Sequence, residues 1–314
     1  MQVGVSTYGG GLWRTWFDRD LTVAGRVILK NGQKIVQKLV HVTRPILNIP
    51  SLAIHLDTDR EKFVFSKEDH LKPILASHIV DELNKEERGD DTPPVESSGS
   101  QTALISPEDH HPYFIQLIAD ELGAPPENIL DFELCVVDAN PACITGLHEE
   151  FVSGPRLDNL VGTYTAITSL ISSCDDIEPW AKNPNWAKDP NIRIAACFDN
   201  EECGSQSAQG AGSSLTEWIL RRLSANATDP CAFEEAIPKS YLISADQAHA
   251  VHPNYRGKHE ENHQLAFHKG VAVKINVNQR YATSGITYAV LKTIADKAHV
   301  PLQVFILYFA TSDD

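Results

Sequence analysis

The feature that most constrains this chain is an acidic motif that directly follows a run of apolar residues. Residues 192–198 predict a buried strand, and Asp199-Asn200-Glu201-Glu202 comes immediately after it. Two adjacent glutamates at the end of a buried strand carry a high desolvation cost unless a cation meets them. Because successive strand residues point in opposite directions, one carboxylate can bind a metal while the other moves a proton. The motif therefore indicates a metal-dependent hydrolase.

The second half of the chain alternates predicted helices with predicted strands. Helices are expected over 160–173, 212–223 and 286–298, and strands over 192–198, 241–244 and 271–277. Strands that alternate with helices favour an α/β layer architecture in which at least part of the sheet is parallel.

The first half predicts mainly β structure. Strands are expected over 21–29, 35–42, 52–56 and 132–137, with an Asn31-Gly32 hairpin turn between the first two. A helix is expected to begin at Ser106-Pro107 and to end near Gly123. Residues 84–101 contain almost nothing apolar, so we expect a solvated, mobile loop there.

Charge and cysteine content exclude several classes of protein. The net charge of -15 argues against nucleic-acid binding and gives no membrane-surface patch. No apolar run approaches the length of a membrane span, and the N-terminus does not have the pattern of a signal peptide. The six cysteines form no CxxC pair, which indicates reduced, mostly buried thiols in a cytoplasmic protein.

Two further acidic positions predict a common metal site with the glutamate pair. Asp158 precedes a predicted helix, Glu202 follows one predicted strand, and Asp246 follows another. Ligands of an open α/β sheet gather beyond the carboxyl ends of its strands, so we expect these carboxylates to converge. Each position also has a structural alternative: a helix cap for Asp158, a solvated loop for the glutamates and a loop cap for Asp246. Carboxylates together with histidine suit Zn²⁺ or Mn²⁺.

Histidine is plentiful, with 13 residues in the chain. Five of them follow Asp246: His249, His252, His259, His263 and His268. His249 lies three residues after a candidate ligand, so it is the best placed to contact a substrate or to support a ligand. His55 lies in the apolar run 52–56, where the alternative is a half-buried, hydrogen-bonded core histidine.

Several longer motifs carry a family resemblance. They span residues 7–21 (with Tyr8-Gly9-Gly10-Gly11), 44–50, 155–159, 199–202, 204–211, 244–255 and 267–270. Together these stretches resemble the aspartyl aminopeptidases, a family of dinuclear metallopeptidases, from Gln2 to about Gln303. The resemblance implies a three-layer α/β metallopeptidase domain, incomplete here, with an inserted β-rich dimerisation domain. Residues 1–147 look like the dimerisation domain and residues 148–314 like part of the metallopeptidase domain.

The resemblance also implies catalytic roles for the acidic residues. Asp158 would bridge two divalent metal ions, and Glu202 and Asp246 would each bind one of them. Glu201 would be the general base and acid, taking a proton from metal-bound water and passing it to the leaving amine. Zinc is the expected metal, with manganese or cobalt as alternatives.

Four more residues would lie near the substrate. His55 matches a histidine that reaches from one subunit into its neighbour's active site, and Lys274 and Tyr281 match positions near the substrate pocket. A lysine there could pair with the acidic side chain of an N-terminal Asp or Glu. With His249, these residues are the expected substrate contacts, and the family assembles as dodecamers built from dimers.

The family pattern contains two further metal ligands, both histidines, that have no match in this chain. One lies in a His-Thr-Asp segment upstream of the Tyr8-Gly9-Gly10-Gly11 motif, and the other lies near the family's C-terminus. We therefore expect a chain truncated at both ends, with an incomplete metal site and little or no activity of its own. Three interpretations stay open: a zinc aminopeptidase that releases N-terminal Asp or Glu, a catalytically inactive truncated isoform that retains dimerisation and assembly, and a gene-model fragment.

Overall fold

The computed structural model describes residues 1–77, 79, 110–174 and 190–306. The chain divides into two compact units, and each is treated by itself below. The first contains Met1–Pro155 and Cys197–Ser240, and the second contains Arg156–Ala196 and Tyr241–Asp314. Within the described residues, no helix is long and apolar enough to cross a membrane.

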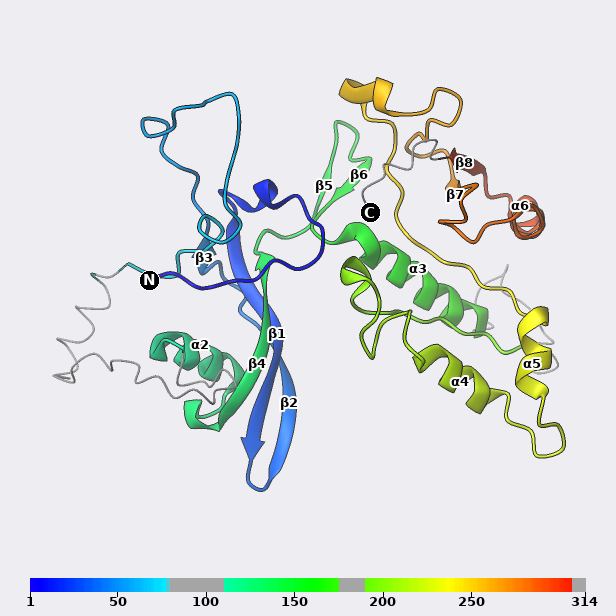
Figure 1. The fold of residues 1–314 in the computed structure, drawn as a ribbon, viewed down its shortest axis with the longest axis horizontal. Coiled ribbons are helices and arrows are strands. Elements are labelled where there is room, and N and C mark those ends of the chain that lie inside the picture. The colour runs from blue at the N-terminus through cyan, green and yellow to red at the C-terminus, as the bar shows by residue number, and fades with distance from the viewer. Residues whose placement is uncertain (78, 80–109, 175–189, 307–314) are drawn as a thin grey trace. The chain divides into compact units, whose positions relative to one another are not determined.

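A twisted antiparallel sheet forms the centre of the first unit (Figure 1). Its strands are β1 (Asp20–Asn31), β2 (Lys34–His41), β3 (Leu47–Asn48) and β4 (Ile129–Asp138), and β1 pairs with each of the others. The β1–β2 hairpin confirms the predicted turn: Asn31 pairs with Lys34, and Gly32 takes a φ of 63°, which favours glycine. The predicted strands 21–29, 35–42 and 132–137 are therefore confirmed.

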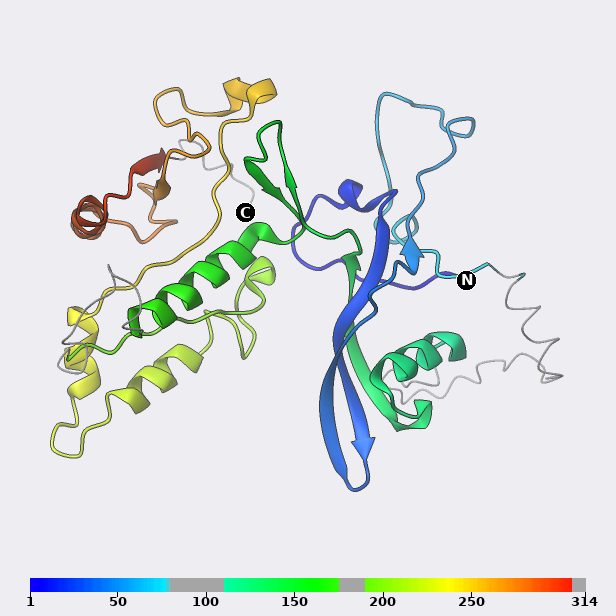
Figure 2. The same cartoon turned by 180° about the vertical axis from the view of Figure 1, so that it is seen from behind.

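Helix α2 (Pro112–Leu122) covers the sheet and completes the core of this unit, as both Figure 1 and Figure 2 show. The fully buried side chains of Leu21 and Val27 from β1 pack in one cluster with Ile118 from α2. Proline at its first position and the His111 side chain, which accepts from the Tyr113 amide, begin the helix. Gly123 ends it as predicted, but the Ser106-Pro107 start lies outside the described residues.

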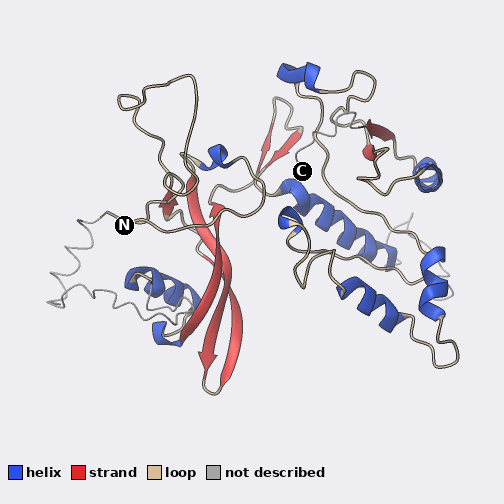
Figure 3. Ribbon diagram, viewed as in Figure 1, coloured by secondary structure: helices blue, strands red, loops and turns tan. Residues whose placement is uncertain are grey.

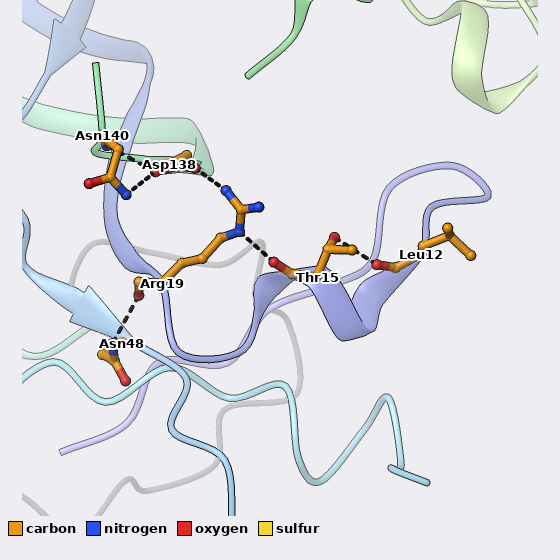
Figure 4. Close-up of polar contacts among 6 residues, drawn as sticks. All are labelled: Leu12, Thr15, Arg19, Asn48, Asp138 and Asn140. Carbon is orange, nitrogen blue, oxygen red and sulfur yellow. Dashed lines mark hydrogen bonds and ion pairs between the residues drawn. The ribbon is translucent and has the colours of Figure 1, made fainter. Parts of the chain in front are cut away.

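Arg19, the residue directly before β1, links the segment that precedes the sheet to the end of β4 (Figure 4). Its guanidinium donates to the Thr15 carbonyl at the end of η1 (Trp13–Trp16) and to the Asp138 carboxylate at the end of β4. The Asn48 amide donates to the Arg19 carbonyl at 2.9 Å. Burial raises the pKa of Asp138, but the bonds from Asn140 and Arg19 outweigh it and hold that pKa below its usual value.

Shorter elements make up the rest of the first unit. They are η3 (Pro126–Asn128), β5 (Cys143–Thr145), β6 (Phe151–Ser153), η5 (Glu201–Cys203), α4 (Leu215–Leu223), α5 (Ala232–Ala236) and η6 (Ile237–Lys239). The helix predicted over 212–223 is confirmed as α4, with the basic pair Arg221-Arg222 in its last turn. Arg221 pairs with Glu217 within α4 and links α4 to α5 through an ion pair with Glu234.

The second unit contains one βαβ element and one long helix (Figure 3). β7 (Val271–Ile275) runs parallel to β8 (Leu302–Ile306), and α6 (Gly285–Ala298) connects them. A capping box begins α6, because the Ser284 and Thr287 side chains each accept from the other residue's backbone amide. The long helix is α3 (Leu157–Cys174), and η7 (Pro253–Lys258) lies in the segment between Tyr241 and β7.

The expected parallel pairing and the helices over 160–173 and 286–298 are therefore present. β8 was not predicted as a strand.

Three predicted strands are wrong. Residues 192–198 and 241–244 have no strand backbone, and residues 52–56 form a turn. A strand needs a ladder of backbone hydrogen bonds, and none of these runs pairs with another strand in the described chain. Their apolar side chains stay exposed, with Leu242 at 82%. The expectation of buried cysteines is also wrong, because all six are exposed, although all are free as predicted.

The predicted division at residue 147 stays a prediction. The first unit's opening stretch ends nearby at Pro155, but that unit also takes in Cys197–Ser240, which we expected in the α/β domain. The expected mobile loop over 84–101 lies outside the described residues.

Candidate functional site

The two glutamates lie in a tight turn, which we call the glutamate loop (residues 199–212). Glu201 and Glu202 begin η5, and Asn200 before them takes a left-handed conformation with a φ of 63°. Backbone bonds close the turn: the Gly204 amide donates to the Glu201 carbonyl at 3.0 Å, and the Ser205 amide donates to the Asn200 carbonyl at 2.9 Å. The turn places both carboxylates on the exposed surface of the first unit.

The amide groups of Gln209 and Asn200 join the two ends of the glutamate loop. The Gln209 side chain donates to Asn200 Oδ1 at 2.8 Å, and the Asp199 amide donates to the Gln209 carbonyl at 3.2 Å. Inside this loop Ser207 Oγ is a buried polar atom with no hydrogen-bond partner in the described part of the chain. The loop is thus a self-contained turn that presents the glutamate pair.

Tyr8 contacts this loop from the N-terminal segment of the same unit. Asn200 Nδ2 donates to the Tyr8 hydroxyl at 2.9 Å, and that hydroxyl lies close enough to the Cys203 thiol for the two groups to interact. The bond from Asn200 lowers the pKa of Tyr8, but the contact with Cys203, burial and the charge of Asp199 outweigh it and raise that pKa above its usual value. Tyr8 therefore stays neutral at physiological pH.

In the second unit, Asn159 brings Asp158 beside Asp246. Asn159 Oδ1 accepts from the Gly162 amide at 3.2 Å, so Asn159 caps the regular part of α3. Its Nδ2 donates to the Ala245 carbonyl at 2.6 Å, which anchors the residue before Asp246. The backbone of Asp158 and Asn159 is not helical, and the carboxyl groups of Asp158 and Asp246 lie close enough to interact. Two of the three predicted metal ligands are therefore neighbours.

Lys274 supplies the positive charge next to this aspartate pair. From β7, its ammonium lies 2.5 Å from Asp246 Oδ2 and 3.0 Å from the Gln247 carbonyl oxygen, and 5.6 Å from the centre of the Tyr281 ring. The Lys274 side chain is only 21% exposed. Burial raises the pKa of Asp246, but the Lys274 ammonium and the bonds from Asp158 and Gln247 outweigh burial and hold that pKa below its usual value.

The predicted histidines lie apart from these contacts. The ring of His249 packs against His259 and Phe305, at 5.1 Å between ring centres for the latter. His259 Nε2 accepts from the His252 amide at 3.0 Å, which fixes the tautomer of His259. His55 is exposed in the turn at 52–56 rather than half-buried in a strand.

Each unit therefore holds one part of the predicted site. Glu201 and Glu202 belong to the first unit, and Asp158, Asp246, Lys274 and Tyr281 to the second. No group of three or more His, Cys, Asp or Glu side chains that could hold a metal occurs among the described residues. The convergence of Glu202 with the two aspartates remains a prediction.

Sequence reasoning missed Asn159, Gln209 and the Tyr8 hydroxyl. All three lie inside motifs that carry the resemblance, which was the available signal.

Two neighbouring aspartates supported by a lysine suit the class of metal-dependent hydrolases, and comparison with known proteins identifies the family. The sequence model of the Aminopeptidase I zinc metalloprotease (M18) family matches residues 1–311. The chain belongs to this family of metalloaminopeptidases. The match runs past Gln303, where we expected the resemblance to end.

Individual relatives agree with this assignment. An aspartyl aminopeptidase of Caenorhabditis elegans is 56% identical over 98% of this chain and 62% of its own length. The cryo-EM structure of the Ape4 and Nbr1 complex superposes with a TM-score of 0.85 at 37% identity, over 99% of this chain and 56% of that one. The S. cerevisiae mApe1 dodecamer, at 24% identity and a TM-score of 0.69, covers 97% of this chain and 61% of that one and shares its fold.

These matches establish the length of the chain relative to its relatives, its fold and the use of a metal in its family. The chain spans 62% of the length of the worm relative, and its fold is of the mixed α/β kind found in M18 aminopeptidases. A divalent metal belongs to the family. The comparisons do not favour the interpretation of an inactive assembly product.

Proposed function

We propose that this chain supplies the catalytic carboxylates and the acid-recognising lysine of a zinc-dependent aminopeptidase that releases N-terminal Asp or Glu from peptides. The observation that carries the proposal is the contact of Asp158 with Asp246, with the half-buried Lys274 beside them. Membership of the M18 family supports the reaction class. The name of the worm relative supports the substrate class.

Two divalent ions, with zinc as the metal, are proposed for these carboxylates. Carboxylate oxygens are suitable zinc ligands, and two neighbouring carboxyl groups form a donor pair that a divalent cation can join. Asp158 would lie between the ions, and Asp246 and Glu202 would each hold one of them. When bound, the metal would polarise the scissile carbonyl and lower the pKa of a water molecule.

Glu201 is the proposed general base and acid. Its carboxylate is exposed in the glutamate loop and makes no hydrogen bond or ion pair with another described side chain. It would take the proton of the attacking water and return it to the amine of the leaving peptide. General acid–base catalysis of this kind contributes about 10²- to 10⁴-fold to a rate.

Lys274 gives the proposed selectivity for acidic N-terminal residues. It is the cation next to the aspartate pair, its stem is largely buried, and the Tyr281 ring flanks its ammonium. A substrate carboxylate could pair with this ammonium through a charge-assisted hydrogen bond. Tyr281, His249 and, from a neighbouring subunit, His55 are the further proposed substrate contacts.

Two broader proposals follow from the same family. Self-association, as dimers and larger assemblies, is proposed from the dodecameric state that the S. cerevisiae mApe1 structure carries in its description. A cytoplasmic location is proposed because the six cysteines are free and exposed, which suits a reducing compartment.

The test of the proposed function is a metal-dependent assay with matched substrates. The purified chain is treated with chelator, reloaded with Zn²⁺ or Mn²⁺, and assayed with aspartyl, glutamyl and leucyl anilides. Metal-restored release that favours the two acidic substrates supports the proposal. Release that is equally fast for leucyl substrate contradicts the acidic selectivity, and no release at any metal concentration contradicts activity of this chain by itself.

A further inference from the structure

We propose that Tyr8 is a positioning residue that clasps the glutamate loop and so fixes the direction of Glu201 and Glu202. This inference rests on the proposed function for the roles of the two glutamates. The contact of Tyr8 with the glutamate loop lies within the first unit, and its effect on the loop can be measured whether or not the chain is active.

The Tyr8 hydroxyl reaches the loop on both sides of the glutamate pair. It accepts from Asn200 Nδ2 at 2.9 Å just before the pair, and it lies close to the Cys203 thiol just after the pair. The Cys203 thiol in turn donates to the Asn200 carbonyl at 3.6 Å, so both residues that flank Glu201 and Glu202 belong to this contact. A neutral tyrosine hydroxyl can accept this bond and still has a proton to donate.

Gly9 brings the N-terminal segment against the second glutamate. A Cβ atom on Gly9 would meet both Cβ and the carbonyl oxygen of Glu202 at 3.0 Å, and the φ of Gly9 is 73°. Both the close approach and the left-handed backbone favour glycine at this position. The Tyr8-Gly9 pair therefore packs on the turn itself and not on a distant part of the loop.

The backbone of the turn sets the direction of the glutamates, because no polar partner among the described side chains holds their carboxylates. No hydrogen bond or ion pair joins the Glu201 or Glu202 side chain to another side chain in the described part of the chain. Asn200 is the residue on which the supporting contacts meet: Gln209 donates to its Oδ1 and Tyr8 accepts from its Nδ2. Loss of the Tyr8 hydroxyl would leave Asn200 Nδ2 without this hydrogen-bond acceptor.

Tyr8→Phe is the primary test because it removes one oxygen atom and keeps the ring. Hydrogen–deuterium exchange of peptides from residues 199–212 measures the clasp directly. We expect exchange in this loop to become about fivefold faster, the effect of losing one hydrogen bond. Zn²⁺ affinity, measured by competition with a chromophoric chelator, is expected to fall about tenfold, as for other residues that orient metal ligands.

A third measurement separates positioning from general destabilisation. In the zinc-loaded protein, Tyr8→Phe should lower kcat about tenfold while KM for an aspartyl anilide changes less than twofold. Tyr164→Phe is the matched control, because Tyr164 is 70% exposed on α3 in the other unit. The control should leave exchange, Zn²⁺ affinity and kcat at the parent values.

A double mutant tests whether Tyr8 acts through Asn200. Asn200→Gly keeps the left-handed backbone and removes the side-chain amide. In that background Tyr8→Phe should lose most of its effect on exchange in the loop.

Unchanged exchange over 199–212 in Tyr8→Phe would overturn the clasp. Faster exchange with unchanged Zn²⁺ affinity and unchanged kcat would overturn the positioning role. If the parent chain neither binds zinc nor turns over, the proposed function fails, while loop exchange still decides whether Tyr8 holds the turn.

Discussion

The sheet of the first unit and the elements of the second differ in how well they bury their apolar residues. In the first, Leu21, Val27 and Ile118 are fully buried in one cluster. In the second, Leu242, Val277 and Ile286 are each at least 80% exposed, and its buried apolar residues are few: Leu265, Val273, Ala295 and Phe305. The first unit thus has a core of its own, whereas the second has a short parallel pair beside exposed apolar surface.

The two units also hold their carboxylates by different physical means. The glutamate loop of the first unit is held by neutral hydrogen bonds from Gln209 and Asn200. The aspartate pair of the second is positioned by the neutral bonds of Asn159 and, in addition, by charge, since Lys274 contacts Asp246. Neutral bonds fix a direction without offsetting charge, which suits a proton carrier. A nearby cation keeps a carboxylate ionised, which suits a metal ligand.

The largest expected effect tests whether the first unit carries the proton transfer. Glu201→Gln keeps the size of the side chain and removes its basicity, so kcat of the zinc-loaded protein should fall about 10³-fold. Zn²⁺ affinity should stay within about twofold, because Glu201 is not a proposed ligand. The measurement is steady-state turnover of an aspartyl anilide together with chelator competition.

Glu121→Gln is the control for this variant, since Glu121 is an exposed carboxylate on α2 away from the glutamate loop. It should retain parent activity. A Glu201→Gln protein that keeps more than a tenth of the parent kcat would remove Glu201 from the role of general base.

The next effect concerns the difference in burial between the units. Ile118→Ala removes a fully buried side chain and should lower the free energy of unfolding by about 3 kcal/mol. Ile286→Ala, at a side chain that is 80% exposed, should change it by less than about 0.5 kcal/mol. Urea unfolding followed by circular dichroism measures both. Equal losses from the two substitutions would contradict the contrast between a packed and an exposed region.

Sequence reasoning was most accurate where local signals and pairing agree. The Asn31-Gly32 turn and alternating strands predicted the β1–β2 hairpin, because turn chemistry and the adjacent strands specify each other. The helices over 160–173, 212–223 and 286–298 were also predicted, since periodicity and caps are local properties. These elements need little information from the rest of the chain.

Sequence reasoning failed where the outcome depends on a distant partner. Residues 192–198 and 241–244 have strand composition, but no described segment pairs with them. β8 was missed because its apolar run becomes a strand only through its parallel pairing with β7. In the site, the acidic positions were found from their places after the predicted strands 192–198 and 241–244 and before a predicted helix, although those two strands do not form. The contact between Lys274 and Asp246 joins residues 28 apart and needed the structure.

A smaller effect tests the charged support in the second unit. Lys274→Met keeps the length of the stem and removes the ammonium, so kcat/KM for aspartyl over leucyl anilide should fall about 10- to 100-fold. Lys292→Met, at an exposed position of α6, is the matched control and should keep the parent ratio. An unchanged ratio in Lys274→Met would place acid recognition elsewhere.

The smallest expected effect tests whether charge also stabilises the first unit. If it does, the two units differ less in their use of charged and neutral contacts. Asp138 and Glu133 both lie on β4 and both pair with an arginine, but the Asp138 side chain is 9% exposed and that of Glu133 is 72% exposed. The pKa of Asp138 is lowered in the folded protein (its bonds are drawn in Figure 4). Its stabilisation is therefore present above the ordinary aspartate pKa of about 3.9 and is lost as pH falls through the lowered value.

Asp138→Asn should consequently lower the free energy of unfolding by about 1 kcal/mol at pH 7, with the difference from the parent shrinking below about pH 4. Glu133→Gln should stay within about 0.5 kcal/mol of the parent at every pH, because solvent screens an exposed ion pair. Urea unfolding at pH 7, 5 and 3 measures both variants. A loss for Asp138→Asn that does not depend on pH would show that Asp138 acts through its shape and neutral hydrogen bonds, as the glutamate loop does, and not through charge.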